Sequence, residues 1–250
     1  MGIGGVIIAA AQPLSQLLGW GDEGFGDELF WGVWRSLEIA AFAFALALII
    51  GLVVALGKLA GPRWLRFLLS GYTVLFRAVP ELILIMLLYY AGTDALNRLL
   101  AAVGLSAVQV NGMVAAIVVL AVVQGAYATE VLRAAIMAVP TGELEAASAL
   151  GMASILRFRR ITLWAMLPNA IPGLANIWLG TIKGTALVSV VGFMELALAT
   201  EQAAGVSKRY FVLYLAAQFV YLAMSLATLY LIGLGEARLR RGQKPMRQVA

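Results

Sequence analysis

One short polar stretch interrupts a chain that is otherwise strongly apolar, and it reads Glu145-Ala146-Ala147-Ser148-Ala149-Leu150-Gly151. A basic cluster, Arg157, Arg159 and Arg160, follows it. Alanine side chains let another surface approach a helix closely, and a glycine permits a turn into a second short helix. The stretch therefore predicts a compact docking element between two spanning segments rather than a simple linker.

The composition indicates an integral membrane protein. Of the 250 residues, 62% are hydrophobic and 12% are charged, whereas soluble domains carry roughly 25% charged residues. The chain has no cysteine and no histidine, which removes disulfides and the commonest general base and metal ligand. It also lacks a G-x-x-x-x-G-K-[ST] phosphate loop and a visible nucleophile–base pair. Neither an ATPase nor a membrane enzyme is expected.

Five segments are long and apolar enough to cross a bilayer, which takes about 20 helical residues. We place them at residues 31–56, 81–100, 112–139, 171–198 and 211–235. A spanning backbone has to satisfy its hydrogen bonds internally, so an all-α bundle is the expected fold class. The bundle forms one transmembrane domain (31–235) between an N-terminal periplasmic or interfacial segment (1–30) and a basic tail (236–250).

The basic residues predict the orientation. Thirteen of the 18 Lys and Arg residues lie in the 57–80 connection, the 133–168 connection and the tail. Cytoplasmic loops are enriched in basic residues, so we expect these three regions in the cytoplasm and the N-terminus outside. The placement of basic residues beside the membrane spans accounts for the net charge of +5, so this charge does not indicate a nucleic acid partner. The 58–79 connection is either an amphipathic helix near the inner interface or an early start of the second span, broken at Pro80.

The polar stretch and its surroundings resemble a known family. The pattern of Glu-Ala-Ala followed by three residues and a Gly resembles the cytoplasmic coupling loop of ATP-binding-cassette (ABC) importer permeases. In this chain the loop would cover about residues 140–168. The runs 126–136 and 139–144, Phe76-Arg77-Ala78-Val79-Pro80-Glu81-Leu82, and Lys183-Gly184-Thr185-Ala186-Leu187-Val188-Ser189 are similar to polar amino acid uptake permeases. Within that group the chain looks most like the histidine/lysine/arginine/ornithine and the octopine and nopaline subunits.

The chain departs from the family pattern in two places. Trp164 follows Ile161-Thr162-Leu163, where the family usually has proline, while Ile177 and Gly184 stand where many members have Glu and Asp. Those acids suit a cationic solute. If the solute is a cation, the resemblance implies that a sister subunit supplies the countercharge, which favours a heterodimer over a homodimer.

The resemblance implies a type I ABC importer permease in a bacterial inner membrane, which is a non-catalytic subunit for polar amino acids, in particular basic ones, or opines. Its implied partners are a homologous permease subunit, two ATP-binding subunits and a periplasmic solute-binding protein. This chain binds no cofactor itself, because ATP and Mg²⁺ are used by the ATPase subunits. The implied ATPase-coupling residues are Glu145, Ala146, Ala147, Gly151, Arg157 and Arg159. The alternative is a secondary carrier or channel that works without ATP.

Candidate pathway residues lie in and near the spans, and they are Glu81, Asn176, Lys183, Gly184, Thr185 and Ser189. Ionisable groups inside a bilayer are costly and usually functional or paired. Lys183 either lines the path or snorkels or pairs with Glu130 or Glu195. Glu81 either stabilises a helix N-terminus, which we favour, or contacts solute. Glu130 and Arg133 are three residues apart and are expected to pair on one helix face.

Overall fold

The computed structural model describes residues 19–21, 24–106 and 111–239, with side chains as far as residue 236. Within these ranges the chain is helical and contains no strand. Five helical segments are long and apolar enough to cross a membrane, namely Gly26–Ala60, Glu81–Ala102, Gly112–Met137, Ser154–Val191 and Tyr210–Glu236. The predicted all-α, five-span architecture is confirmed. Most of the predicted N-terminal segment and of the basic tail lies outside the described residues.

Helices α3 (Gly26–Ala60) and α6 (Gly112–Met137) form the centre of the bundle. The buried face of α3 carries small residues, among them Ala43, Ala47 and Gly51, and α6 meets it with small residues of its own. A Cβ added to Gly51 would lie 2.7 Å from the Cβ of Ala128. Small residues let helix backbones approach closely where lipid gives no hydrophobic drive, so this contact depends on side-chain size.

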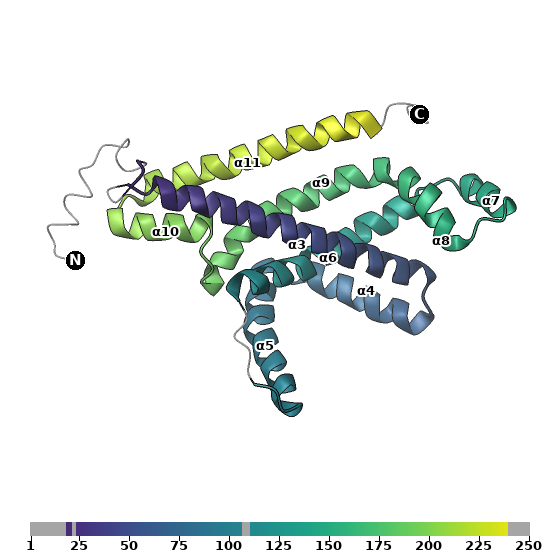
Figure 1. Cartoon of the computed structure of the whole chain (residues 1–250), viewed down its shortest axis with the longest axis horizontal. Helices are drawn as coiled ribbons and strands as arrows, with labels where there is room; N and C mark the ends of the chain where they lie inside the picture. Colours follow the sequence, from purple (N-terminus) through teal and green to yellow (C-terminus); the bar gives the residue numbers. More distant parts are fainter. Residues whose placement is uncertain (1–18, 22–23, 107–110, 240–250) are drawn as a thin grey trace.

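Helix α4 (Arg63–Ala78) runs back along α3 after a tight turn at Gly61 and Pro62. It packs on α3 and α6, and its Tyr72 hydroxyl donates to the carbonyl of Val122 at 2.5 Å. Helix α5 (Glu81–Ala102) starts after the break at Pro80 and leans away from the other helices (Figure 1). The connection thus forms a separate helix that packs on α3 and α6 and ends before Pro80, and it is not among the segments that are long and apolar enough to cross a membrane.

The fourth span differs from its predicted position at residues 171–198. The helical run begins at Ser154 with α8 (Ser154–Arg157), passes through a π-helical turn (Phe158–Thr162) and continues as α9 (Leu163–Val188). Pro168 and Pro172 lie inside α9 and do not end it. A short 3₁₀ turn (Ser189–Val191) leads to Gly192, whose φ of +83° ends the segment. Residues 192–198 therefore lie beyond the span.

A buried carboxylate starts the next helix, α10 (Leu196–Ser207). Glu195 Oε1 accepts from the backbone N–H groups of Ala197 (2.7 Å) and Leu198 (3.0 Å), as an N-cap does. Its Oε2 lies 3.1 Å from the Ser36 hydroxyl of α3 and accepts from Tyr221 of α11 (Tyr210–Leu239) at 2.8 Å. Glu195 thus connects three helices at one end of the bundle.

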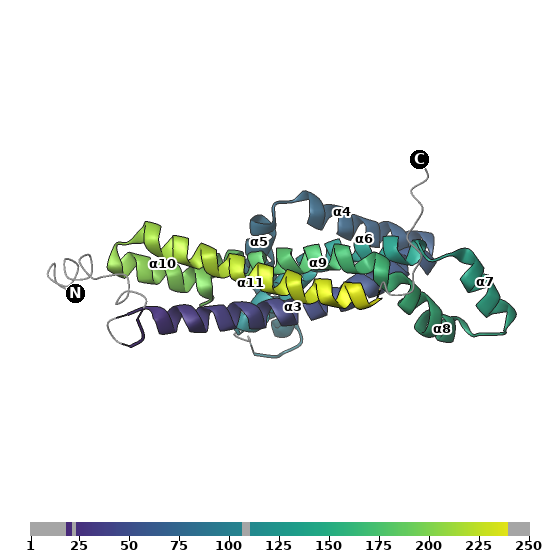
Figure 2. The same ribbon diagram turned by 90° about the horizontal axis from the view of Figure 1, so that it is seen from above.

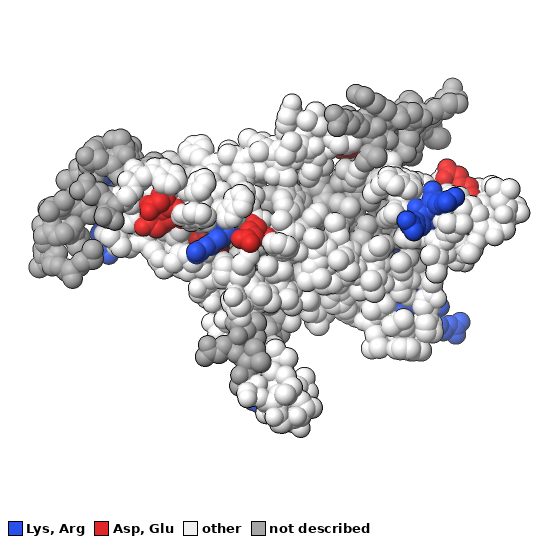
Figure 3. All heavy atoms as spheres, in the orientation of Figure 1, with Lys and Arg blue, Asp and Glu red and all other residues white. Residues whose placement is uncertain are grey.

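The long helices run along one axis, so the bundle has two ends (Figures 1 and 2). Helix α10 and the start of α3 lie at one end, and α7 (Thr141–Ala149), α8 and the α3–α4 turn lie at the other. A wide uncharged band separates the charged side chains on the face in Figure 3. Such a band is expected of a lipid-facing surface.

Candidate functional site

The predicted docking element forms an elbow of two short helices, α7 and α8, which we call the α7–α8 elbow (residues 141–157). It projects beyond the long helices at the end that also carries the α3–α4 turn (Figure 2). Glu145 and Ala146 are exposed on α7, whereas Ala147 is buried. A helix on this projection can be reached by another protein without disturbing the bundle.

Gly151 sets the angle of the elbow. Its φ is +73°, in the left-handed region. The N–H of Met152 donates to the carbonyl of Ala147 (3.1 Å), and the N–H of Gly151 donates to that of Ser148 (3.0 Å). These two bonds form a Schellman motif, which ends a helix with glycine in the left-handed conformation. The predicted role of Gly151 as a turn residue thus has a defined geometry.

The basic residues of the elbow differ in their surroundings. A guanidinium nitrogen of Arg157 donates to the hydroxyl of Ser148, which in turn donates to the carbonyl of Leu144 at 2.8 Å. Arg157 therefore braces α8 against α7. Arg159 and Arg160 are exposed on the following π-helical turn, so they remain accessible to a partner.

Two apolar side chains of the elbow were not among the predicted residues. Leu150 is 83% exposed and Ile155 is 84% exposed, and they flank the turn at Gly151. Exposed apolar side chains on a polar projection mark contact surfaces for another protein. Their signal in the sequence is a Leu and an Ile among small and charged residues of the connection between the third and fourth spans.

A cavity of about 370 Å³ lies between α4, α5, α6 and α9, and it contains the charged groups Arg77, Glu81 and Glu130. Asn176 also lines it, as predicted for a pathway residue. Glu81 lies in the first turn of α5, the position predicted to stabilise a helix N-terminus, and its Oε1 accepts a hydrogen bond from Gln124 Nε2 of α6 at 2.8 Å. The guanidinium of Arg77 stacks over the ring of Tyr127 at 5.7 Å.

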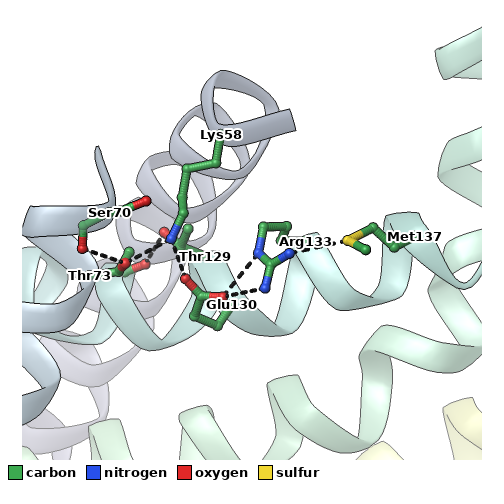
Figure 4. Close-up of polar contacts among 8 residues, drawn as sticks. Lys58, Ser70, Thr73, Thr129, Glu130, Arg133 and Met137 are labelled. Atoms are coloured by element: carbon green, nitrogen blue, oxygen red, sulfur yellow. Dashed lines mark hydrogen bonds and ion pairs between the residues drawn. The ribbon is translucent and has the colours of Figure 1, made fainter. Parts of the chain in front are cut away.

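The carboxylate of Glu130 has two cationic partners (Figure 4). Lys58 Nζ lies 2.5 Å from Oε1 and also donates to the hydroxyl of Thr73 at 2.9 Å. Arg133 reaches Oε2 at 3.0 Å, which confirms the predicted pair on one helix face. The sequence did not identify Lys58 as a partner. With Glu130 occupied by two cations and Glu195 by hydroxyls and backbone N–H groups, neither predicted carboxylate pairs with Lys183.

The remaining predicted pathway residues do not gather in one place. Gly184 packs against the Glu81 side chain, since a Cβ added at Gly184 would lie 3.1 Å from Glu81 Oε1. Lys183, the next residue, faces the other way into a groove of about 530 Å³ between α9 and α11. Thr185 is buried and donates to Ile182 of its own helix, and Ser189 donates likewise to Ala186. The set is thus divided between the cavity, the groove and helix packing.

A projecting elbow on a five-span bundle has a counterpart among known protein families. Residues 47–241 match the family model described as "Binding-protein-dependent transport system inner membrane component". The chain belongs to this family. The permease is therefore a membrane subunit of a transporter rather than an enzyme, as the sequence predicted.

Curated relatives give the same result at higher identity. The permease is 39% identical over 213 residues to the nopaline transport system permease protein NocQ of Agrobacterium fabrum, which covers 84% of this chain and 89% of that protein. It is 42% identical over 180 residues to the histidine/lysine/arginine/ornithine transport system permease protein HisQ of Escherichia coli, with 72% and 79% covered. These are the subgroups that the sequence motifs resembled.

Solved structures agree on the fold. A chain in the crystal structure of an amino acid ABC transporter with histidines superposes with a TM-score of 0.71 at 28% identity, covering 86% of the permease and 95% of that chain. An inward-facing MetNI methionine ABC transporter gives a TM-score of 0.65 at 22% identity, with 87% and 97% covered. The predicted type I ABC importer architecture is confirmed by these neighbours.

Proposed function

We propose that the permease forms one half of the membrane pathway of an ATP-driven importer for polar amino acids, with cationic amino acids or opines as its solutes. The α7–α8 elbow carries this proposal, because a rigid projection with exposed apolar side chains is a surface for a separate motor. The relatives named for nopaline and for histidine, lysine, arginine and ornithine transport support the solute class.

The ATPase subunits dock on the elbow. Ala146 and Leu150 of α7 and Ile155 of α8 are exposed there, with Glu145 and Arg159 as polar contacts. Gly151 and the Arg157–Ser148 bond hold the two short helices at a fixed angle. When two ATPase subunits close around ATP and Mg²⁺, a rigid elbow passes their movement to the bundle. The permease itself binds no nucleotide.

The cavity lined by Arg77 and Glu81 forms this subunit's part of the solute path. It offers a guanidinium to a carboxylate and a carboxylate to a cation, which matches the two charges of an amino acid. Asn176 adds a polar side chain on α9. The hydroxyls of Thr185 and Ser189 donate to carbonyls of this same helical segment, so they are occupied within it.

The assembly includes a periplasmic solute-binding protein on the side of α10 and a homologous permease subunit, in a heterodimer rather than a homodimer. The elbow and the C-terminal tail face the cytoplasm of a bacterium, and the N-terminus faces the periplasm. The basic α3–α4 turn lies at the same end as the elbow, which supports this orientation.

Reconstitution tests the proposal. The permease is placed in proteoliposomes with candidate partners from the same genome, namely an ATPase, a second permease and a solute-binding protein, and arginine-stimulated ATP hydrolysis and uptake are measured. Ile155→Glu and Leu150→Glu are expected to abolish stimulation, since each puts a charge on the docking surface. Leu105→Glu is the matched control, because Leu105 is also exposed (59%) but lies on the connection after α5.

Two outcomes would contradict the proposal. Uptake that proceeds without ATP and without the partners would identify a secondary carrier or channel. Unchanged stimulation in both elbow variants, with normal insertion, would show that the motor docks elsewhere.

A further inference from the structure

Lys183 is an exposed cation on a spanning helix, α9, and no Asp or Glu in the described part of the chain forms an ion pair with it. The ion pairs found there use other cations, namely Lys58, Arg98 and Arg133. An ionisable group inside a membrane span is costly and is usually paired or functional. The partner of the Lys183 ammonium group is therefore sought outside the permease.

The depth of Lys183 in the span argues against lipid phosphate as that partner. Residues 184–191 carry no charge, and the helical run ends at Val191. At a rise of about 1.5 Å per residue, the backbone of Lys183 lies about 12 Å inside this end. This depth exceeds the length of a lysine side chain, so the ammonium group does not reach phosphates at the membrane surface. The geometry favours an anion that itself lies within the span.

The groove that contains Lys183 has the length of a helix contact. Its volume is about 530 Å³, and along α11 it extends from Gln218 to Leu229, which is about three turns of helix. Most of its large side chains are leucines, namely Leu179, Leu222, Leu226 and Leu229. An apolar spanning helix that carries one acid matches this surface in length, polarity and charge.

The charge of the groove selects a subunit that differs from this chain. Among the described residues that line it, none is Asp or Glu. A second copy of the chain, related by a two-fold axis, would present the same surface from the other side. The two Lys183 ammonium groups would then face each other without an acid between them. A homologous subunit with an acid in the facing helix replaces this repulsion by an attraction.

We propose that the groove between α9 and α11 receives a spanning helix of the homologous permease subunit, and that Lys183 forms an ion pair there with an Asp or Glu of that helix. This inference rests on the proposed function. It deepens that function by naming the surface and the residue that favour a different subunit over a second copy of this chain.

Assembly of the full complex tests the charge. The tagged permease is produced with the ATPase, the second permease and the solute-binding protein, and the second permease recovered with it in mild detergent is quantified. Lys183→Met removes the charge and keeps an apolar side chain that a bilayer accepts. We expect recovery to fall by roughly tenfold, because the partner's acid stays unpaired. Lys208→Met is the matched control, since Lys208 is exposed outside the spans.

Rescue identifies the acid on the partner. Each Asp and Glu in the spanning segments of the second permease is changed to Leu in the presence of Lys183→Met. One of these changes should restore recovery, since a well-packed apolar pair can replace a buried ion pair. Lys183→Glu, combined with a change of that same acid to Lys, should also assemble because the two charges are exchanged.

Cross-linking tests the location. The chain has no cysteine, so one introduced thiol carries a benzophenone-maleimide probe at a single position. Leu226→Cys places the probe in the groove, and Val53→Cys places it on α3 as a control of similar exposure, at 57% and 64%. We expect illumination to join the permease to the second permease from Leu226→Cys and not from Val53→Cys.

Normal recovery of the second permease with Lys183→Met would overturn the inference, and reduced arginine uptake in that assembled variant would identify Lys183 as a solute contact instead. Cross-links from Leu226→Cys to lipid alone, or to a second copy of this chain, would overturn it as well. A wild-type permease that imports arginine without a second permease would instead contradict the heterodimer of the proposed function.

Discussion

Lys58 on α3 and Glu130 on α6 join two central helices through an ion pair of 2.5 Å. The Lys58 side chain is 12% exposed and that of Glu130 is 21% exposed, so water screens the pair only in part. Arg133 completes the network from the same face of α6. Removal of one charge from such a partly buried pair destabilises the folded protein, because the remaining charge has neither its partner nor full solvation by water.

Glu130→Gln should therefore destabilise the permease. Fully buried pairs cost roughly 3–5 kcal/mol when broken and exposed pairs less than about 1 kcal/mol, so we expect about 2 kcal/mol here. The measurement is thermal unfolding of the purified complex in detergent. Asp94→Asn is the matched control, because the Asp94–Arg98 pair is 59% and 80% exposed and its loss should change the Tm little. Equal shifts in both variants would contradict this prediction.

Gly51→Ala should loosen the α3–α6 contact. The added Cβ would lie 2.7 Å from Ala128 Cβ and 3.0 Å from the backbone of the same residue, so the helices have to separate. Overpacking of this kind costs about 1–3 kcal/mol. The readout is again the unfolding temperature in detergent. Gly71→Ala on α4, where nothing lies within 4 Å of an added Cβ, should leave it unchanged or raise it.

Gly151→Ala tests the elbow through backbone geometry alone. An added Cβ meets no atom within 4 Å, but the φ of +73° disfavours any residue with a Cβ by roughly 1–2 kcal/mol. We expect weaker arginine-stimulated ATP hydrolysis at normal membrane levels.

Gly142→Ala on the same short helix is the control for Gly151→Ala. It has equal space and lies in helical backbone, so it should retain full stimulation. Gly151→Asn should recover part of the loss, since asparagine tolerates the left-handed conformation. Full activity of Gly151→Ala would mean that the angle of the elbow does not matter for coupling.

Glu195 predicts a pH dependence of stability. Burial raises the pKa of its carboxyl above the ordinary value of 4.5, against the opposing effect of the hydrogen bonds from Ala197, Tyr221 and Leu198. Below pH 4.5 the Glu195 carboxyl is protonated in both the folded and the unfolded state, and the hydrogen-bonded, protonated carboxyl contributes fully to the free energy of unfolding. As the pH rises through the folded pKa, the unfolded state ionises first and that contribution is lost.

Glu195→Gln should remove this pH dependence, because glutamine still accepts the backbone bonds that start α10. The unfolding temperature of wild type and variant is compared from pH 4 upwards, and the difference should move in favour of the variant as the pH rises. A difference that stays constant with pH would contradict the raised pKa.

The sequence predicted the five spans because each is a long apolar run, and it predicted the elbow because a polar stretch stands out between two such runs. It misplaced the fourth span, because the helical run already begins at Ser154 and continues through a π-helical turn and past Pro168 and Pro172. The end at Gly192 depends on backbone conformation, which composition does not reveal.

The site residues were harder to predict where partners are distant in sequence. Lys58 and Glu130 are 72 residues apart, and Glu81 and Gly184 lie on different helices. Lys183 was grouped with Gly184 because they are neighbours in sequence, but successive residues on a helix point in different directions. Helix α9 contributes to both sites, with Asn176 lining the cavity and Lys183 lining the groove.

The break at Pro80 places Glu81 at a pivot. Helix α5 is 22 residues long, or about 33 Å, and leans away from the bundle. A swing of about 20° around Pro80 would sweep the far end of α5 through about 11 Å, yet it would shift the backbone of Glu81 by less than about 1 Å. Such a movement of α5 would leave the acidic group of the cavity almost stationary.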